Sequence, residues 1–293
     1  MPQSNNLVGL LLVGDVHVGK WTPHFNIKVV GEQLKKVGKE VTQLAKEHHL
    51  KEVTVALLGD IVEGEQIYPA QEHFLDTVNP TLLRKVFPYL ASLQEQASAH
   101  VLLQTFIAAQ FLWHELIKPL TEHVKVSIAG VVGNHGAIRR SHPLSNYDAW
   151  CYLILDLLIK AEGGKVRMLT ESQAYQVITL NGWRFLLAHG SDIKTWHGIP
   201  FYGIQKRTLY LMASKVLGEV HAVCLGHFHQ TFVQLDIPAI FLTGTFILND
   251  DYPIRRFGLP GSNYCLFLVV GSKSLCEAIY PINLKEGIKD EKP

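Results

Sequence analysis

Cysteine is scarce in this chain, with only 4 among its 293 residues. Cys151, Cys224, Cys265 and Cys276 lie in apolar surroundings, and no two of them have CxxC spacing. A disulfide framework or a cysteine-ligated zinc site is therefore not expected. Reduced cysteines inside a core are typical of cytoplasmic proteins, so we expect a cytoplasmic location.

The sequence also lacks the segments that direct a chain to or across a membrane. Residues 1–6 are polar and uncharged, whereas a signal peptide opens with positive charge. The apolar run that follows, at 7–13, ends directly in Gly14-Asp15 and is too short to span a bilayer. We therefore expect no signal peptide, no transmembrane helix and no membrane partner.

Neither sign of charge dominates the composition. The chain has 27 Lys+Arg and 26 Asp+Glu, which gives a formal net charge of +1. No global field therefore marks an obligate nucleic-acid binder, although a local basic patch stays open. Because 47% of the residues are hydrophobic, the chain can bury a large core. We expect a single domain over residues 1–284, followed by a charged, flexible tail at 285–293.

Apolar periodicity predicts strands and helices that alternate in the first half of the chain. Residues 7–13, 52–58 and 124–132 are rich in apolar side chains, as is typical of buried strands. Residues 28–48 instead carry apolar side chains at spacings of three and four, which predicts a helix. A strand, a helix and a parallel strand form a βαβ unit, so the α/β class is predicted.

A long segment separates the second predicted strand from the third. The distance along the chain from Asp60 to Asn134 far exceeds what one crossover connection needs. The pattern predicts a short helix at 80–90 and a long helix at 92–118 that stops before Pro119. We interpret about 70–123 as a helical insertion packed beside the site, and as a candidate surface for a protein partner or for self-association.

The second half of the chain predicts further helices and a second sheet. Asn181-Gly182 is a strong hairpin signal between the expected strands at 174–180 and 183–188. Four short strands near the carboxyl terminus imply another sheet. The remaining expected elements are helices at 146–160 and 205–217 and strands at 165–170, 221–225, 231–235, 239–242, 264–270 and 275–280.

Short glycine-containing fragments with Asp, Asn or His follow the apolar runs. An α/β sheet binds its ligands at the carboxyl ends of its strands, so these side chains are expected to meet at one edge. They offer oxygen and imidazole ligands enough for two metal ions. The fragments are Gly14-Asp15-Val16-His17, Gly59-Asp60, Gly133-Asn134-His135-Gly136, Ala188-His189-Gly190 and Gly226-His227-Phe228-His229.

This ligand set suits the hydrolysis of a phosphate ester. Two metal ions provide a nucleophile at neutral pH and clamp the phosphate oxygens. Asp60 stands alone after its strand and is the natural bridging ligand. We assign Asp15, His17 and His229 to one metal ion, and Asn134, His189 and His227 to the other.

Other residues near these ligands are candidates for contact with the substrate. His135 adjoins Asn134 but is spare in the ligand count, so we assign it to protonating the leaving group. Arg139 and Arg140 are candidates for bidentate hydrogen bonds to phosphate oxygens, and a solvated arginine pair is the open alternative. His24 lies in a loop after the first motif and is expected over the same edge.

The order of these motifs resembles that of the calcineurin-like metallophosphoesterase superfamily, D-x-H, G-D, G-N-H-[DE], a lone His and G-H-x-H. The resemblance spans residues 14–229, and its closing Gly226-His227-Phe228-His229 looks most like the phosphodiesterase and DNA-repair nuclease branches. It implies a four-layer α/β/β/α sandwich whose carboxyl-terminal strands form part of the second sheet. It also implies two metal ions, Mn first, with Fe or Zn as alternatives.

The chain departs from this pattern at one position. Superfamily members usually carry Asp or Glu after the G-N-H, where it orients the histidine, and here that position is Gly136. Glu63 and Asp148 are candidates for orienting His135 instead. Glycine would alternatively let the backbone approach the substrate closely.

The sequence leaves three functions open. The first is a nuclease or DNA phosphodiesterase, and the second is a phosphatase or phosphodiesterase acting on small molecules such as nucleotides. The third is a non-hydrolytic subunit with a vestigial metal site, whose helical insertion binds a partner. The third is disfavoured because a vestigial site has no chemical need for the complete ligand set.

Overall fold

The computed structural model describes residues 6–65, 67–68, 100–139, 142–169, 174–195, 200–213, 218–236, 238–258 and 260–287. The helix expected at 80–90, the first part of the long helix and Arg140 lie outside these residues. Most of the expected tail at 285–293 also lies outside them.

The first sheet has six strands in the order β13-β12-β1-β2-β3-β6. The strands β1, β2, β3 and β6 run parallel, as the βαβ pattern predicts, whereas β12 pairs antiparallel with β1 and β13 pairs antiparallel with β12. Their bounds are β1 Val8–Val13, β2 Glu52–Leu57, β3 Lys125–Gly130, β6 Val166–Met168, β12 Tyr264–Val270 and β13 Ala278–Asn283.

The second sheet has five strands in the order β10-β11-β9-β8-β7. The expected hairpin at Asn181-Gly182 joins β7 to β8, and Asn181 has the positive φ, 50°, that such a turn needs. The strands are β7 Tyr175–Leu180, β8 Trp183–Ala188, β9 Ala222–Leu225, β10 Phe232–Gln234 and β11 Ala239–Leu242.

The placement of the carboxyl-terminal strands corrects one expectation. Only β10 and β11 join the second sheet, while β12 and β13 complete the first. β2 pairs with one edge of β1, so the other edge needs a partner, and β12 pairs along it from Val8↔Val270 to Leu12↔Leu266. Every residue of β12 after Tyr264 is buried, because helices cover one face of this strand and the second sheet covers the other.

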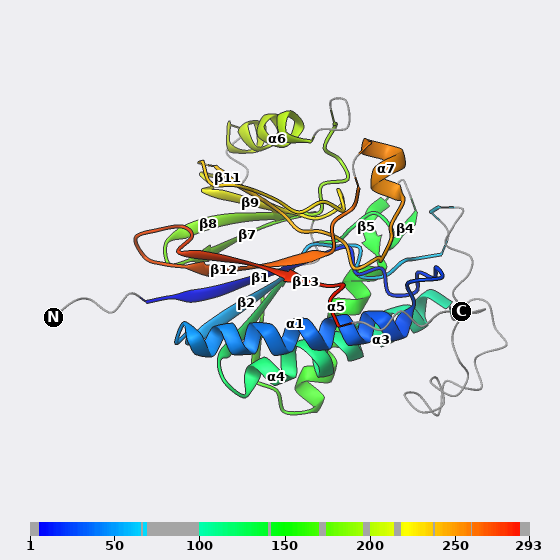
Figure 1. The fold of residues 1–293 in the computed structure, drawn as a ribbon, viewed down its shortest axis with the longest axis horizontal. Coiled ribbons are helices and arrows are strands. Elements are labelled where there is room, and N and C mark those ends of the chain that lie inside the picture. Colours follow the sequence, from blue (N-terminus) through cyan, green and yellow to red (C-terminus); the bar gives the residue numbers. More distant parts are fainter. Residues whose placement is uncertain are drawn as a thin grey trace.

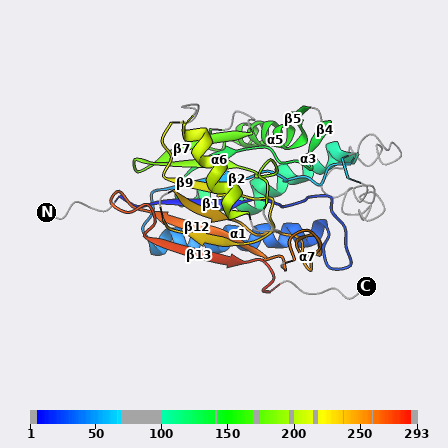
Figure 2. The same ribbon diagram turned by 90° about the horizontal axis from the view of Figure 1, so that it is seen from above.

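Helices enclose the two sheets and complete the predicted four-layer α/β/β/α sandwich (Figure 1). Three helical segments cover the outer face of the first sheet: α1 Ile27–Glu47, the segment from α3 His100–Phe111 to α4 Lys118–Thr121, and α5 Tyr147–Ala161. The helix α6 Phe201–Ala213 covers the outer face of the second sheet (Figure 2). Among the described residues, no helix has both the length and the apolar composition needed to cross a membrane.

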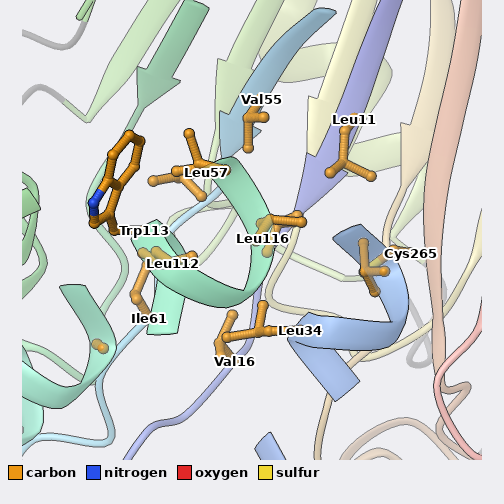
Figure 3. Close-up of a cluster of buried hydrophobic side chains, with 14 of the residues drawn as sticks. Leu11, Val16, Leu34, Val55, Leu57, Ile61, Leu112, Trp113, Leu116 and Cys265 are labelled. Atoms are coloured by element: carbon orange, nitrogen blue, oxygen red, sulfur yellow. The ribbon is translucent and has the colours of Figure 1, made fainter. Parts of the chain in front are cut away.

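Alternation along β1 shows how one strand serves two cores. Leu11 and Val13 face the helices, while Leu10 and Leu12 face the second sheet, and all four are fully buried. Figure 3 shows the helical side of this arrangement, where Leu11 and Val55 of the sheet lie above Leu34, Leu112 and Leu116 of the helices. A strand buried on both faces explains the continuous apolar run at 7–13.

The long helix before β3 does not stop before Pro119, contrary to the expectation. A π-helical turn, η4 Leu112–Ile117, leads into α4, and Pro119 occupies the first turn of α4. Proline is tolerated there because the first turn has no need of its missing N–H. Trp113 and Leu116 are buried in the core against the first sheet, so this described part of the expected insertion belongs to the outer helical layer.

Three short elements near the site were not expected from the sequence. A two-stranded ribbon, β4 Ala137–Arg139 and β5 His142–Asn146, follows the third motif. A short helix, α7 Tyr252–Phe257, follows β11. Both lie toward the carboxyl ends of the parallel strands (Figure 1).

Candidate metal centre

The loops that follow β1 and β2 continue the pairing of these strands beyond the sheet. The backbone N–H of Asp15 donates to Gly59 O at 3.1 Å, and that of His17 donates to Asp60 O at 3.0 Å. This pairing places the Asp15, His17 and Asp60 side chains together at the carboxyl edge. The first two predicted motifs therefore form one rigid unit.

Most of the predicted ligands have left-handed backbone conformations. The φ angles are 52° at Asp15, 50° at His17, 49° at Asp60, 68° at His227 and 53° at His229. Non-glycine residues rarely adopt this region, which costs about 1–3 kcal/mol each where the surrounding structure enforces it. Such concentrated strain is typical of a functional site.

Asp15, His17 and His229 form the first group of candidate ligands, and all three are buried. His229 Nε2 lies 3.3 Å from His17 Nε2 and 3.3 Å from Asp15 Oδ1. Two imidazole nitrogens and a carboxylate oxygen therefore face a common point, as the sequence predicts for one metal ion. We call this group position A.

Asp60, Asn134, His189 and His227 form the second group, which we call position B. His189 Nε2 lies 3.0 Å from Asp60 Oδ2 and 2.8 Å from Asn134 Oδ1. Asp60 has one carboxylate oxygen close to His189 and His227 and also lies close to His17 and His135. This placement between the two positions fits the predicted bridging role.

Electrostatics at both positions favour a bound cation. Burial opposes ionisation of Asp15 and Asp60, but the histidines beside them hold the pKa of each carboxyl below its ordinary value. Burial also favours neutral rings, yet Asp60 raises the pKa of His189 to about 9 and Asp15 raises that of His229 to about 10. The carboxylates thus favour the protonated, positively charged form of these rings. A metal ion binds such a ligand set in place of the protons. The donor set fits a pair of metal ions.

Glu63 is the candidate carboxylate that contacts His135. Its Oε2 lies 3.3 Å from His135 Nδ1 and 2.7 Å from His17 Nδ1, and its Oε1 accepts a hydrogen bond from Lys20 at 3.1 Å. Gly136 leaves no room for the usual acidic side chain, because a Cβ there would lie 2.5 Å from Asn146 Oδ1, which caps α5. Glu63, from the second motif, therefore occupies the position expected of the orienting carboxylate.

Asp148, the other candidate for orienting His135, has a different role. Its buried carboxylate accepts backbone N–H bonds from Asp60, Ile61, Val62 and Gly133, at 2.8–3.2 Å. It thereby ties the loop after β2 to the loop after β3. Burial raises the pKa of Asp148 to about 6.

The structure gives no contact between the candidate ligands and the described residues that were predicted to bind substrate. Arg139 is exposed on β4, and Arg140 lies outside the described residues. His24 is exposed and lines a groove of about 970 Å³ along α1, together with Lys28 and Lys35. Their roles in binding substrate stay predictions.

Three residues that the sequence did not indicate contact the ligands. Asp250 hydrogen-bonds to His229 Nδ1, and the Tyr252 ring lies 5.2 Å from the His229 ring. Tyr68 accepts a hydrogen bond from Asn134 Nδ2 at 2.9 Å, and its ring lies 4.6 Å from that of His135. None of them belongs to a motif with fixed spacing; only the turn residues Asn249-Asp250 gave a local signal.

No model of a protein family and no curated protein sequence matches the chain. Solved structures do match it. Vps29 from Entamoeba histolytica, in complex with Zn²⁺, has a TM-score of 0.43 and 12% identity over 96% of this chain and 94% of that one. Vps29 from Chaetomium thermophilum has a TM-score of 0.37 and 9% identity over 94% and 95%.

YfkN from Bacillus subtilis, a calcineurin-like phosphoesterase, matches with a TM-score of 0.39 and 12% identity over 97% of this chain and 93% of that one.

Proposed function

We propose that this protein is a calcineurin-like metallophosphoesterase that hydrolyses phosphate esters with the help of two metal ions. The observation that carries the proposal is the convergence of the predicted ligands on two adjacent positions, A and B, with Asp60 close to residues of both. Convergence from fragments so distant in the sequence, on strained and buried backbone, favours an active site over a vestigial one.

Asp15, His17 and His229 would hold one ion, Asn134, His189 and His227 the other, and Asp60 both. Bound there, a metal pair would supply a nucleophile from water and neutralise phosphate oxygens. Oxygen and imidazole ligands suit Mn²⁺, which we propose as the cofactor, and they also suit Fe or Zn.

His135 would move a proton at the leaving oxygen. The contact of its Nδ1 with the Glu63 carboxylate supports Nε2 as the ring nitrogen that would donate this proton. Tyr68 packs against the same ring and limits its rotation. Arg139 would contact non-bridging phosphate oxygens from the exposed end of β4, with Arg140 beside it.

We propose phosphodiesters, DNA among them, as the substrate class, on the resemblance of Gly226-His227-Phe228-His229 to the phosphodiesterase branches. The alternative is a phosphatase or phosphodiesterase acting on nucleotides or other small molecules. A phosphodiester and a monoester differ in charge, so matched model substrates separate a phosphodiesterase from a phosphatase, and single-stranded DNA separates a nuclease from a phosphodiesterase of small molecules.

The test measures hydrolysis of bis-p-nitrophenyl phosphate, p-nitrophenyl phosphate and single-stranded DNA. We expect EDTA to abolish activity and Mn²⁺ to restore it, with the diester hydrolysed faster than the monoester. Preference for the monoester would favour the phosphatase. Absence of hydrolysis in protein loaded with two Mn ions per chain would refute the enzymatic proposal, and loading with at most one ion would refute the two-metal site.

A further inference from the structure

Asp250, which precedes α7, uses both oxygens of its carboxylate. Oδ2 accepts a hydrogen bond from His229 Nδ1, and Oδ1 accepts one from the backbone N–H of Tyr252 at 3.1 Å. The Asp250 side chain is 9% exposed and that of His229 is 6% exposed, so water competes little for this contact. The adjacent Asp251, in contrast, is 68% exposed.

The contact decides which nitrogen of His229 carries a proton. An ionised carboxylate accepts only, so Nδ1 must donate, and Nε2 is then available to a metal ion on the side of Asp15 and His17. Carboxylates that hold metal-bound histidines in this way fix both the tautomer and the ring orientation.

Among the residues that the structure describes, no carboxylate takes the equivalent place behind His189 at position B. His189 Nδ1 lies 2.9 Å from Leu58 O, a neutral backbone carbonyl. Asp250 therefore acts on position A alone, and it also connects that position to α7, whose Tyr252 ring lies beside His229.

We propose that Asp250 is a positioning residue that sets the metal affinity of position A by holding His229 in its ligating tautomer. The inference rests on the proposed two-metal function. It assigns to the segment before α7 a part in metal binding that the motifs do not indicate.

Asp250→Asn tests the tautomer. An amide has one acceptor oxygen for two N–H donors, so its NH₂ group must oppose either His229 Nδ1–H or the Tyr252 N–H. We expect the affinity of one of the two Mn²⁺ positions to fall about 10–100-fold, the range for loss of such a partner, and the other to be unchanged. Mn²⁺ titration followed by EPR measures this, because coupled pairs and isolated ions give different spectra.

Asp250→Ser separates tautomer control from a merely structural role. The serine hydroxyl can still accept from the Tyr252 N–H but leaves His229 without an opposing donor. Tautomer control therefore predicts a smaller loss of Mn²⁺ affinity in Asp250→Ser than in Asp250→Asn. A structural role predicts the reverse order, because Asn preserves the shape of Asp. That reverse order would overturn the proposal.

Asp251→Asn is the matched control. It removes the same charge one residue away, where the exposed Asp251 pairs with the exposed Arg255, so both Mn²⁺ affinities should stay at wild-type values. Wild-type affinity at both positions in Asp250→Asn, or equal losses at both, would refute the inference while leaving the phosphoesterase function intact. Conversely, a wild-type protein that binds two ions without hydrolysing any ester would refute the function, and a selective loss in Asp250→Asn would still support the inference.

Discussion

Strain at single residues is concentrated at the candidate ligands. Asp15 and His17 keep left-handed backbone because their N–H groups are bonded to the neighbouring loop at Gly59 and Asp60. Side chains that are already held in place lose little conformational entropy when a metal ion binds. That entropy is lost when the protein folds. The residues that hold these loops are therefore as important to the site as the ligands themselves.

Asp148 is the residue on which this positioning most depends. In Asp148→Asn, one end of the side chain becomes an NH₂ group that faces two backbone N–H donors. We expect the free energy of unfolding in EDTA to fall by roughly 2–4 kcal/mol, from buried donors left without an acceptor. Urea denaturation measures this. Asp156→Asn, on the same helix but paired with the exposed Lys160, should change the midpoint little.

His135 should affect the reaction rather than the metal ions. A general acid contributes about 10²- to 10⁴-fold, and most when the leaving group is poor. We expect His135→Ala to keep both ions, to lose most of its rate on an alkyl phosphodiester, and to lose much less on a p-nitrophenyl ester. The exposed His123, changed to Ala, is the control.

Two other results would reassign His135. An equal loss of rate on both substrates would mean that the ring stabilises charge on the phosphate. Loss of a metal ion would make His135 a ligand, which its position within reach of His17 and Asp60 allows.

The sequence indicates the candidate ligands because each stands in a local pattern. Asp15, Asp60 and His189 directly follow buried strands, so an apolar run with a glycine is signal enough. Asp250 is 21 residues from His229, and Tyr68 is 66 residues from Asn134. Their contacts depend on the paths of loops, for which the sequence has no periodic signal.

At the scale of elements, α1 crosses η4 closely at a glycine. A Cβ at Gly38 of α1 would lie 2.5 Å from Glu115 O of η4, a backbone atom that cannot move alone. Alanine would gain about 1 kcal/mol of helix propensity but would lose roughly 1–3 kcal/mol to overpacking. We expect Gly38→Ala to lower the urea midpoint.

Gly31→Ala, about two turns earlier on the same side of α1, is the comparison. Its Cβ would meet only the end of the Phe111 ring, at 3.2 Å, and that side chain can shift. The gain in propensity should then be retained, and the midpoint should stay constant or rise. A lower midpoint for Gly31→Ala than for Gly38→Ala would show that the crossing at η4 is not the tighter contact.

The sequence predicts whether a segment is a helix or a strand more readily than which strands lie next to each other in a sheet. Periodicity gives α1 and β1 almost to the residue, because burial on one face or on two leaves a direct trace in the sequence. The same trace does not say which sheet a buried strand joins, and β12 was assigned to the wrong one. Pro119 likewise predicts a helix end only where the preceding turn is α-helical, and here that turn is π-helical.

At the scale of the whole molecule, the site joins the two sheets. Asp15, Asp60 and Asn134 follow strands of the first sheet, whereas His189 and His227 follow strands of the second. Metal ions bound to this set would link both halves of the sandwich. An unfolded chain cannot present such a site, so metal binding should stabilise the native state as a unit.

Mn²⁺ should therefore raise the urea midpoint of the whole protein in a single transition. Free Mn²⁺ at 100 times its dissociation constant adds about 2.7 kcal/mol for each position filled. Asp60→Asn should lose most of this increment, because an amide cannot balance two cations, whereas Asn134→Ala weakens position B alone and should lose only part of it. The increment is the free energy of unfolding of each variant in Mn²⁺ minus that of the same variant in EDTA. A change in stability that does not depend on metal therefore cancels. Equal increments in Asp60→Asn and Asn134→Ala would mean that Asp60 serves one ion, and the link between the sheets would then depend on two independent sites.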